Sequence, residues 1–196
     1  MLIAASQITG TPIMSLQTGK ELAVTGSAII NPHNLTVIAY KIEGAHLDND
    51  PSYLRCADIR EVGSLGMIVD SSDEFLEPDD IISDKHIYEI AFELEGKQVI
   101  DEKKNKVGKV IDYVIDIDSF VIQQLVVKRP LLKSFGDDEL LVHRGQIVEV
   151  NDELIVIQSG ELKDKMPVRA SRHYVNPFRQ SSPQPESTKT KQPSHF

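Results

Sequence analysis

The sequence of 196 residues contains no tryptophan and one cysteine, Cys56. A single cysteine excludes an intrachain disulfide and a cluster of thiolate ligands within one chain. Cys56 lies in the run YLRCAD, which offers no activating base. We therefore expect a packed, unreactive thiol rather than a nucleophile. The apolar runs are short, as in LIVI, or contain aspartate, as in YVIDIDSFVI, and none approaches the roughly 20 residues of a membrane span.

The first residues, MLIAASQITG, contain no basic leader followed by a hydrophobic core. We therefore expect a cytoplasmic protein without a transmembrane segment. The motifs of phosphate-binding loops, dinucleotide sites, nucleophile elbows and zinc proteases do not occur. The histidines are dispersed without the spacing of metal ligands, at His33, His46, His86, His143, His173 and His195. These absences favour a non-enzymatic protein with no cofactor, no metal site and no small-molecule substrate.

Two acidic clusters have a chemical alternative to a structural role. The run DSSDEFLEPDD (70–80) is rich in carboxylates, but it lacks the central glycine and the ligand order of a calcium loop, so we expect a solvated connector. Asp112, Asp116 and Asp118 lie near a strand–turn junction. Paired carboxylates serve acid–base chemistry, but no nucleophile accompanies these, and turn capping is the favoured interpretation.

The net charge of −9 is unevenly distributed. Residues 1–162 contain 14 basic and 28 acidic residues, a balance of −14, whereas residues 163–196 contain 7 and 2, a balance of +5. The body therefore repels nucleic acid and acidic lipid, while the C-terminal segment attracts them or an acidic partner.

Short β-branched runs separated by turn clusters such as QTGK and NPHN predict an all-β protein. The same order of runs occurs twice. Gly10 corresponds to Gly96, 86 positions on, and Tyr40 corresponds to Leu125, 85 positions on. The hairpin DIREVGSLGMIVD (58–70) corresponds to QIVEVNDELIVIQ (146–158) at 88 positions. Small drifts of this kind result from loop insertions, so we infer a tandem repeat of about 80 residues.

The second copy resembles a known family. The run GKQVIDEKKNKVGKVIDYVIDIDSFVIQQLVVK is similar to the opening of a PRC-barrel domain, and HRGQIVEVNDELIVIQ is similar to its closing hairpin. The first copy keeps the order of elements but lacks the acidic D-x-x-x-D positions. The resemblance implies a small β-barrel that serves as an interaction module, with no general catalytic residues. Such domains occur in the photosynthetic reaction-centre H subunit and in a ribosome maturation factor, where the barrel docks on a ribosomal protein.

The predicted architecture is therefore two tandem small PRC-like β-barrels, residues 1–80 and 96–162. A helical connector is expected over 81–95, where Ile87, Ile90, Ala91 and Leu94 form one apolar stripe. Residues 163–196 are expected to form a basic, largely disordered tail, because its end is rich in Ser, Thr, Pro and Gln and has little to bury.

Candidate partner-binding residues lie in the closing hairpin of the first copy and in the tail. Arg60 and Gly66 occupy the positions of Val148 and Leu154 in the second copy. Each has lost apolar bulk, so we expect a more open hairpin that presents a partner surface.

In the tail, Arg169, Arg172, Tyr174 and Phe178 are of the residue types that concentrate binding energy at interfaces. The alternative is that Val168 and these two aromatic residues pack back onto the second barrel.

The favoured function is a protein-interaction adaptor or scaffold, with the tail as a possible partner-binding segment. The alternative is an RNA-processing or ribosome-assembly accessory factor that docks on a ribosomal protein, with the basic tail contacting RNA.

Overall fold

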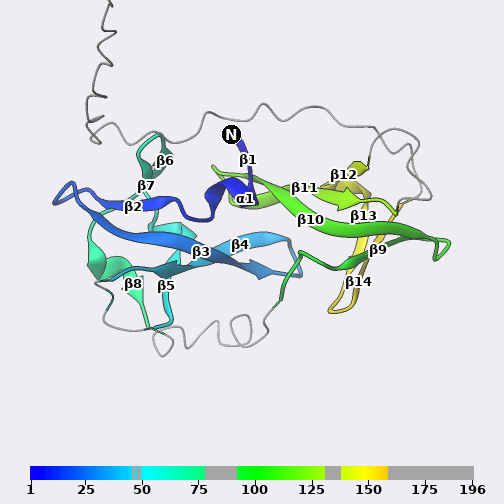
Figure 1. Ribbon diagram of the computed structural model, residues 1–196, viewed down its shortest axis with the longest axis horizontal. Coiled ribbons are helices and arrows are strands. Elements are labelled where there is room, and N and C mark those ends of the chain that lie inside the picture. Colours follow the sequence, from blue (N-terminus) through cyan, green and yellow to red (C-terminus); the bar gives the residue numbers. More distant parts are fainter. Residues whose placement is uncertain (46, 48–49, 78–91, 131–137, 159–196) are drawn as a thin grey trace, which may run out of the picture.

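The protein is described by a computed structural model of residues 1–45, 47, 50–77, 92–130 and 138–158. In this part of the chain almost all regular structure is β, in one sheet of 14 strands. The exceptions are the four-residue helix α1 (Ala5–Ile8) and three-residue 3₁₀ turns. The all-β prediction is therefore confirmed. Figure 1 shows residues 12–76, the first half, in blue to cyan beside residues 92–158, the second half, in green to yellow.

Each half contains the same series of elements. In the first half they are β2 (Pro12–Ser15), β3 (Glu21–Asn31), β4 (Thr36–Glu43), β5 (Ser52–Arg55), the 3₁₀ turn η1 (Cys56–Asp58), β6 (Glu61–Gly63) and β7 (Gly66–Val69). In the second half they are β9 (Gln98–Asp101), β10 (Lys106–Asp116), β11 (Val121–Lys128), β12 (Glu139–His143), the 3₁₀ turn η5 (Arg144–Gln146), β13 (Ile147–Val150) and β14 (Leu154–Ile157). The first half ends with η2 (Ser72–Glu74) and β8 (Phe75–Leu76), which pairs with β5.

The strand pairings of the two halves also agree in register. Val24 pairs with Glu43 in β3–β4, and Lys109, 85 positions after Val24, pairs with Lys128 in β10–β11. Both hairpins shift register at corresponding places. The parallel contact of β2 with β7 recurs between β9 and β14. The sequence correspondence at 85 to 88 positions is thus also a correspondence of backbone hydrogen bonding.

Short strands follow the alternation expected of a sheet with one buried face, as in β12 with Leu140 and Val142 buried. In β4 the alternation shifts by one position, because Ala39 and Tyr40 are both buried. Buried residues of both halves form one continuous hydrophobic cluster. Because both halves contribute to this core, loss of packing in one of them is expected to weaken the other.

The N-terminal segment lies on the second half, not on the first. Strand β1 (Leu2–Ala4) pairs antiparallel with β10, and α1 follows directly. Ser6 then donates from its hydroxyl to the Asp112 carboxylate at 2.7 Å. Figure 1 shows this segment lying against the green strands before the chain enters β2. The first residues therefore tie the two halves together.

The predicted connector and tail lie mostly or wholly outside the described residues. Residues 81–91 of the connector and residues 163–196 of the tail are outside the described residues. Residues 92–95 are described and form no helix. Leu94 belongs to the predicted apolar stripe, and it is buried in the core without forming a helix.

Tyr40 carries the one buried side-chain oxygen or nitrogen in the described part of the chain that has no hydrogen-bond partner. Its ring packs edge-on against Phe120 with centroids 6.5 Å apart. Tyr40→Phe keeps this packing and removes an unpaired hydroxyl. We expect the free energy of unfolding to stay equal or to rise by up to about 1 kcal/mol. Tyr40→Ala, in contrast, should lower it by about 3–5 kcal/mol. Urea denaturation checks both values, and a large loss in Tyr40→Phe would contradict the unpaired hydroxyl.

Candidate interaction site

The two halves meet through the tips of two corresponding hairpins, the β3–β4 turn and the β10–β11 turn. The backbone N–H of Val37 donates to the carbonyl of Phe120 at 2.9 Å, and the N–H of Ile122 donates to the carbonyl of Leu35 at 2.9 Å. Leu35 corresponds to Phe120, and Val37 to Ile122, each 85 positions apart. The contact is therefore reciprocal, like the isologous interface of a two-fold dimer, although it joins two parts of one chain.

The centre of this junction lies between Thr36 and Val121, which are paired across β4 and β11. These residues are themselves 85 positions apart, so a local two-fold axis passes between them. Leu35 and Phe120 precede them and both have positive φ, 49° and 54°. Left-handed backbone at a residue other than glycine is uncommon. Both tips therefore use the same backbone conformation to present their carbonyls to the opposite half.

On one side of the axis the junction is filled by Arg144, the first residue of η5. Its guanidinium donates to the carbonyls of Asn34 at 2.7 Å and of Leu35 and Ile122 at 3.4 Å. Guanidinium is a planar donor with several N–H groups, which suits a cluster of carbonyl oxygens. Arg144 thus connects the second half to the tip of the first.

On the other side the corresponding residue is Cys56, the first residue of η1 and 88 positions earlier. Its side chain is too short to reach across the junction, and a groove of about 710 Å³ lies there. The groove is formed by β4, η1, β6 and the β10–β11 turn. Arg144 and Cys56 therefore make a nearly symmetric junction asymmetric: one side is filled and the other is open.

Cys56 itself is buried, and burial raises the pKa of its thiol well above the ordinary value. The thiol is therefore protonated at neutral pH and a poor nucleophile. The burial agrees with the prediction of a packed cysteine.

The two arginines that line the groove are paired with carboxylates. Arg60 donates from Nε and Nη2 to the two carboxylate oxygens of Asp70, at 3.0 and 2.6 Å. Arg55 pairs with Asp58 at 2.8 Å. The hydrogen bonds from Arg60 also lower the pKa of the Asp70 carboxyl. Both pairs are solvent-exposed, so each contributes little to stability, but each reduces the positive charge at the groove.

The two hairpin candidates lie in different surroundings. Arg60 lines the groove and is 65% exposed. Val148, its counterpart, is 53% exposed, so Arg60 replaces no core side chain. Gly66 is buried, and a Cβ atom there would lie 2.1 Å from the carbonyl oxygen of Pro12. The expectation of an open hairpin at Gly66 is therefore wrong, because the missing side chain lets β2 approach closely. The predicted tail residues Arg169, Arg172, Tyr174 and Phe178 lie outside the described residues.

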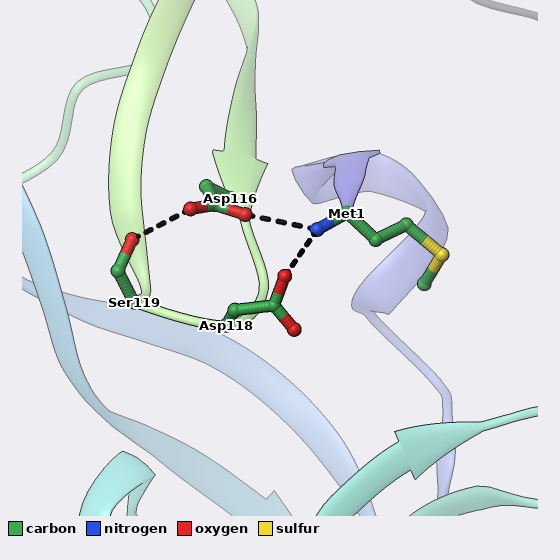
Figure 2. A network of polar contacts seen from close by, with 4 residues as sticks. All are labelled: Met1, Asp116, Asp118 and Ser119. Atoms are coloured by element: carbon green, nitrogen blue, oxygen red, sulfur yellow. Dashed lines mark hydrogen bonds and ion pairs between the residues drawn. The ribbon is translucent and has the colours of Figure 1, made fainter.

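The aspartates of the second half have structural partners. The α-ammonium of Met1 donates to Asp116 at 3.0 Å and to Asp118 at 2.6 Å, and Ser119 donates to the other oxygen of Asp116 at 2.9 Å (Figure 2). Asp112 accepts from Ser6, as described above. Asp116 therefore caps the β10–β11 turn, as predicted. Asp112, which lies within β10, and Asp118 instead hold the N-terminal segment.

The Met1–Asp116 contact predicts opposite pH dependences at its two ends. Hydrogen bonding to Asp118 and Asp116 raises the pKa of the α-amino group above 8.0, and the same ammonium lowers the pKa of Asp116 below 3.8. The stabilisation is complete between these values. It is lost above pH 8 as the amine deprotonates, and below pH 3.8 as the carboxylate is protonated. NMR titration of Asp116 checks the direction, and acetylation of Met1 should raise the carboxyl pKa. An unchanged pKa after acetylation would contradict the contact.

Sequence reasoning missed Arg144, although one signal was available. Aligning the closing hairpins at 88 positions places Arg144 opposite Cys56, a large cation opposite a small thiol. That mismatch marks a place where the two copies differ. The carbonyls that receive Arg144 are backbone atoms, which no sequence pattern displays.

Within the described ranges no group of three His, Cys, Asp or Glu side chains is arranged to hold a metal ion. The described part also contains no helix with the length and apolar character needed to cross a membrane.

Comparison with known proteins finds a family match for one part of the chain. No curated protein matches the sequence. The family model of the PRC-barrel domain matches residues 88–163, a range that contains β9 to β14 and begins beyond the first half. The resemblance noted for the second copy is thereby confirmed: residues 88–163 match the PRC-barrel domain family.

Proposed function

We propose that the protein is a non-enzymatic interaction adaptor built from two tandem PRC-like barrels. The observation that supports this most directly is the agreement in strand order and register between the two halves. Since the second half matches the PRC-barrel family, the same hydrogen-bonded pattern in the first half favours a second unit of that kind. We treat the first half as this second unit from here on.

The junction gives the adaptor a fixed geometry. Reciprocal backbone hydrogen bonds, the Arg144 contacts and the shared core hold the two units together. A partner surface that spans such a junction needs little ordering on binding, which favours affinity. The open groove beside Cys56 is the concave part of this surface, and concave sites are where ligands preferentially bind. We assign the partner-binding surface to this groove and its rim, including Arg60.

The proposal is tested by affinity purification from cells with the full chain and a variant of the groove. Ala57 lines the groove and is exposed, so Ala57→Tyr should cover it without disturbing the core. The matched control is Gly145→Tyr, at the corresponding position beside Arg144, where the junction is already filled. We expect a reproducible set of partners with wild type and the control, and at least a tenfold loss of these partners with Ala57→Tyr.

A second variant, with Ala at Arg169, Arg172, Tyr174 and Phe178, tests the tail as a partner-binding segment. Equal partner recovery by all variants would reject the groove and the tail together. Recovery of ribosomal subunits, lost only in the tail variant, would favour the ribosome-assembly alternative instead.

A further inference from the structure

The two sides of the junction have corresponding backbone positions, and on one side the guanidinium of Arg144 donates to the carbonyls at these positions. Arg144 bonds to the carbonyls of Asn34, Leu35 and Ile122. The positions that correspond to these three on the open side are Ser119, Phe120 and Val37, and all three line the groove. A carbonyl oxygen has two lone pairs, so a carbonyl already in a backbone hydrogen bond can accept another donor.

We propose that the open groove is a guanidinium site, and that its occupant is an arginine of the chain's own basic segment, residues 163–196. In this arrangement the arginine donates to the carbonyls of Ser119, Phe120 and Val37, as Arg144 donates to their counterparts. Cys56, which stands where Arg144 stands on the other side, leaves the space that the incoming side chain fills. The inference goes beyond the proposed adaptor function, because it concerns a contact within one chain; a partner that binds in the groove would then have to displace this arginine.

Charge favours this occupant. The body up to residue 162 has a balance of −14 and the segment after it a balance of +5. Asp118 and Glu61 line the groove, and Asp118 already pairs with the α-ammonium of Met1, so Glu61 is the carboxylate left to favour a second cation. Arg55 and Arg60 are each paired with a carboxylate. The groove is therefore not closed to a cation by unpaired positive charge from these two arginines.

The segment has the right side chains and sufficient length. It contains Arg169, Arg172 and Arg179, which are 11, 14 and 21 residues beyond Gln158, the last described residue. An extended chain spans about 3.3–3.6 Å per residue, so these arginines reach roughly 36 to 75 Å from Gln158. A compact body of this size has a radius of gyration of about 15 Å. A short tether also gives an effective concentration in the millimolar range, so that a weak site is occupied.

Arginine is preferred to lysine for a geometric reason. The guanidinium presents five N–H donors in a plane and keeps its charge at all accessible pH values, whereas an ammonium is a compact, strongly hydrated point charge. Three carbonyls, one from β4 and two from the β10–β11 turn, are matched better by the planar group. Replacement by lysine should therefore empty the groove even though the charge stays the same.

The test uses purified full-length protein and backbone amide NMR signals of Val37, Ile38, Ser119 and Phe120. A triple variant with Gln at Arg169, Arg172 and Arg179 should shift these signals, and a triple variant with Lys at the same positions should shift them to the same place. The matched control, with Gln at Lys163, Lys189 and Lys191, removes three charges but no guanidinium. It should leave the groove signals within about a tenth of the shift seen in the arginine variants.

The variant Cys56→Arg is an independent test, because its new arginine would supply a guanidinium to the groove in place of the tail arginine. If the variant keeps the wild-type thermal midpoint, the Nε–H signals of the tail arginines should move to the positions of free arginine. Should Cys56→Arg fail to fold, N-acetyl-arginine amide added to the Gln triple variant takes its place, and should restore the wild-type groove signals at millimolar concentration.

Three outcomes overturn the inference. Groove signals unchanged by the Gln variant would exclude the tail as the occupant. If N-acetyl-arginine amide nevertheless shifted these signals, the guanidinium site would belong to an arginine of a partner protein. A Lys variant identical to wild type would show that charge alone is recognised. None of these measurements involves a partner, so their failure is distinguishable from failure of the adaptor proposal.

Discussion

Gly66→Ala is expected to lower the free energy of unfolding by about 2–5 kcal/mol. Gly66 begins β7 with φ of +117°, a backbone conformation that costs an L side chain about 1–3 kcal/mol. In addition, the new Cβ would lie 2.1 Å from the carbonyl oxygen of Pro12, and a backbone atom cannot rotate away from it. The parallel contact of β2 and β7 must therefore open, with a further cost similar to that of overpacking a core.

Gly63→Ala is the matched control, because it adds the same methyl group to the same hairpin. The nearest atom to a Cβ there is a side-chain oxygen of Glu61 at 3.4 Å, and this side chain is free to move. We expect a change of less than about 0.5 kcal/mol. Urea denaturation of both variants gives the comparison. Equal stabilities of the two variants would contradict the close approach of β2 to Gly66.

Gly66 also illustrates what sequence comparison could and could not supply. Alignment at 88 positions correctly identified it as the counterpart of Leu154, and its hairpin was correctly predicted. The expectation drawn from this difference was wrong. A glycine in place of a large side chain can leave open space, or it can allow a neighbouring backbone to occupy that space. Only the position of the Pro12 carbonyl, 54 residues away in sequence, decides between the two.

The repeat itself was predictable because it depends on residues whose roles are local. Gly10 and Gly96 both adopt positive φ, 78° and 81°, and donate to corresponding carbonyls in β3 and β10. Tyr40 and Leu125 both fill the core from the centre of a strand. Glycine at a turn and large apolar residues at alternate positions leave a pattern in the sequence that two copies then repeat.

The junction was not predictable, because its contacts are between backbone atoms distant in sequence. The residues at the two tips, Leu35 and Phe120, look like ordinary apolar residues next to turns. Their carbonyls receive the N–H groups of Ile122 and Val37, and backbone hydrogen bonds depend little on side-chain identity. The path of the N-terminal strand is similar. Leu2–Ala4 form a short apolar strand that suits any open edge, and its pairing with β10 follows from the tertiary arrangement.

Arg144→Met is expected to lower the free energy of unfolding by about 2 kcal/mol. Hydrogen bonds to a charged group are each worth about 1.5–3 kcal/mol, but two of the three Arg144 contacts are long, at 3.4 Å. Methionine retains most of the apolar contact of the arginine stem. The loss of stability therefore measures the contribution of the guanidinium. Arg60→Met removes an exposed ion pair with Asp70 and should cost less than about 1 kcal/mol. Chemical denaturation of the two variants measures the difference.

A double variant that exchanges Arg144 and Cys56 tests whether the two sides of the junction are equivalent. Arg144→Cys combined with Cys56→Arg moves the guanidinium from the carbonyls of Asn34, Leu35 and Ile122 to their counterparts across the axis. If the two sides are equivalent in backbone geometry, the double variant should recover more than half of the stability that Arg144→Cys loses alone. Recovery of this kind is a coupling between residues 88 positions apart, and double-mutant analysis measures it directly. A double variant no more stable than Arg144→Cys would mean that the counterpart carbonyls do not form an equivalent site. Since the guanidinium site proposed for the open groove requires that equivalence, the exchange tests its structural premise without reference to the tail or to any partner.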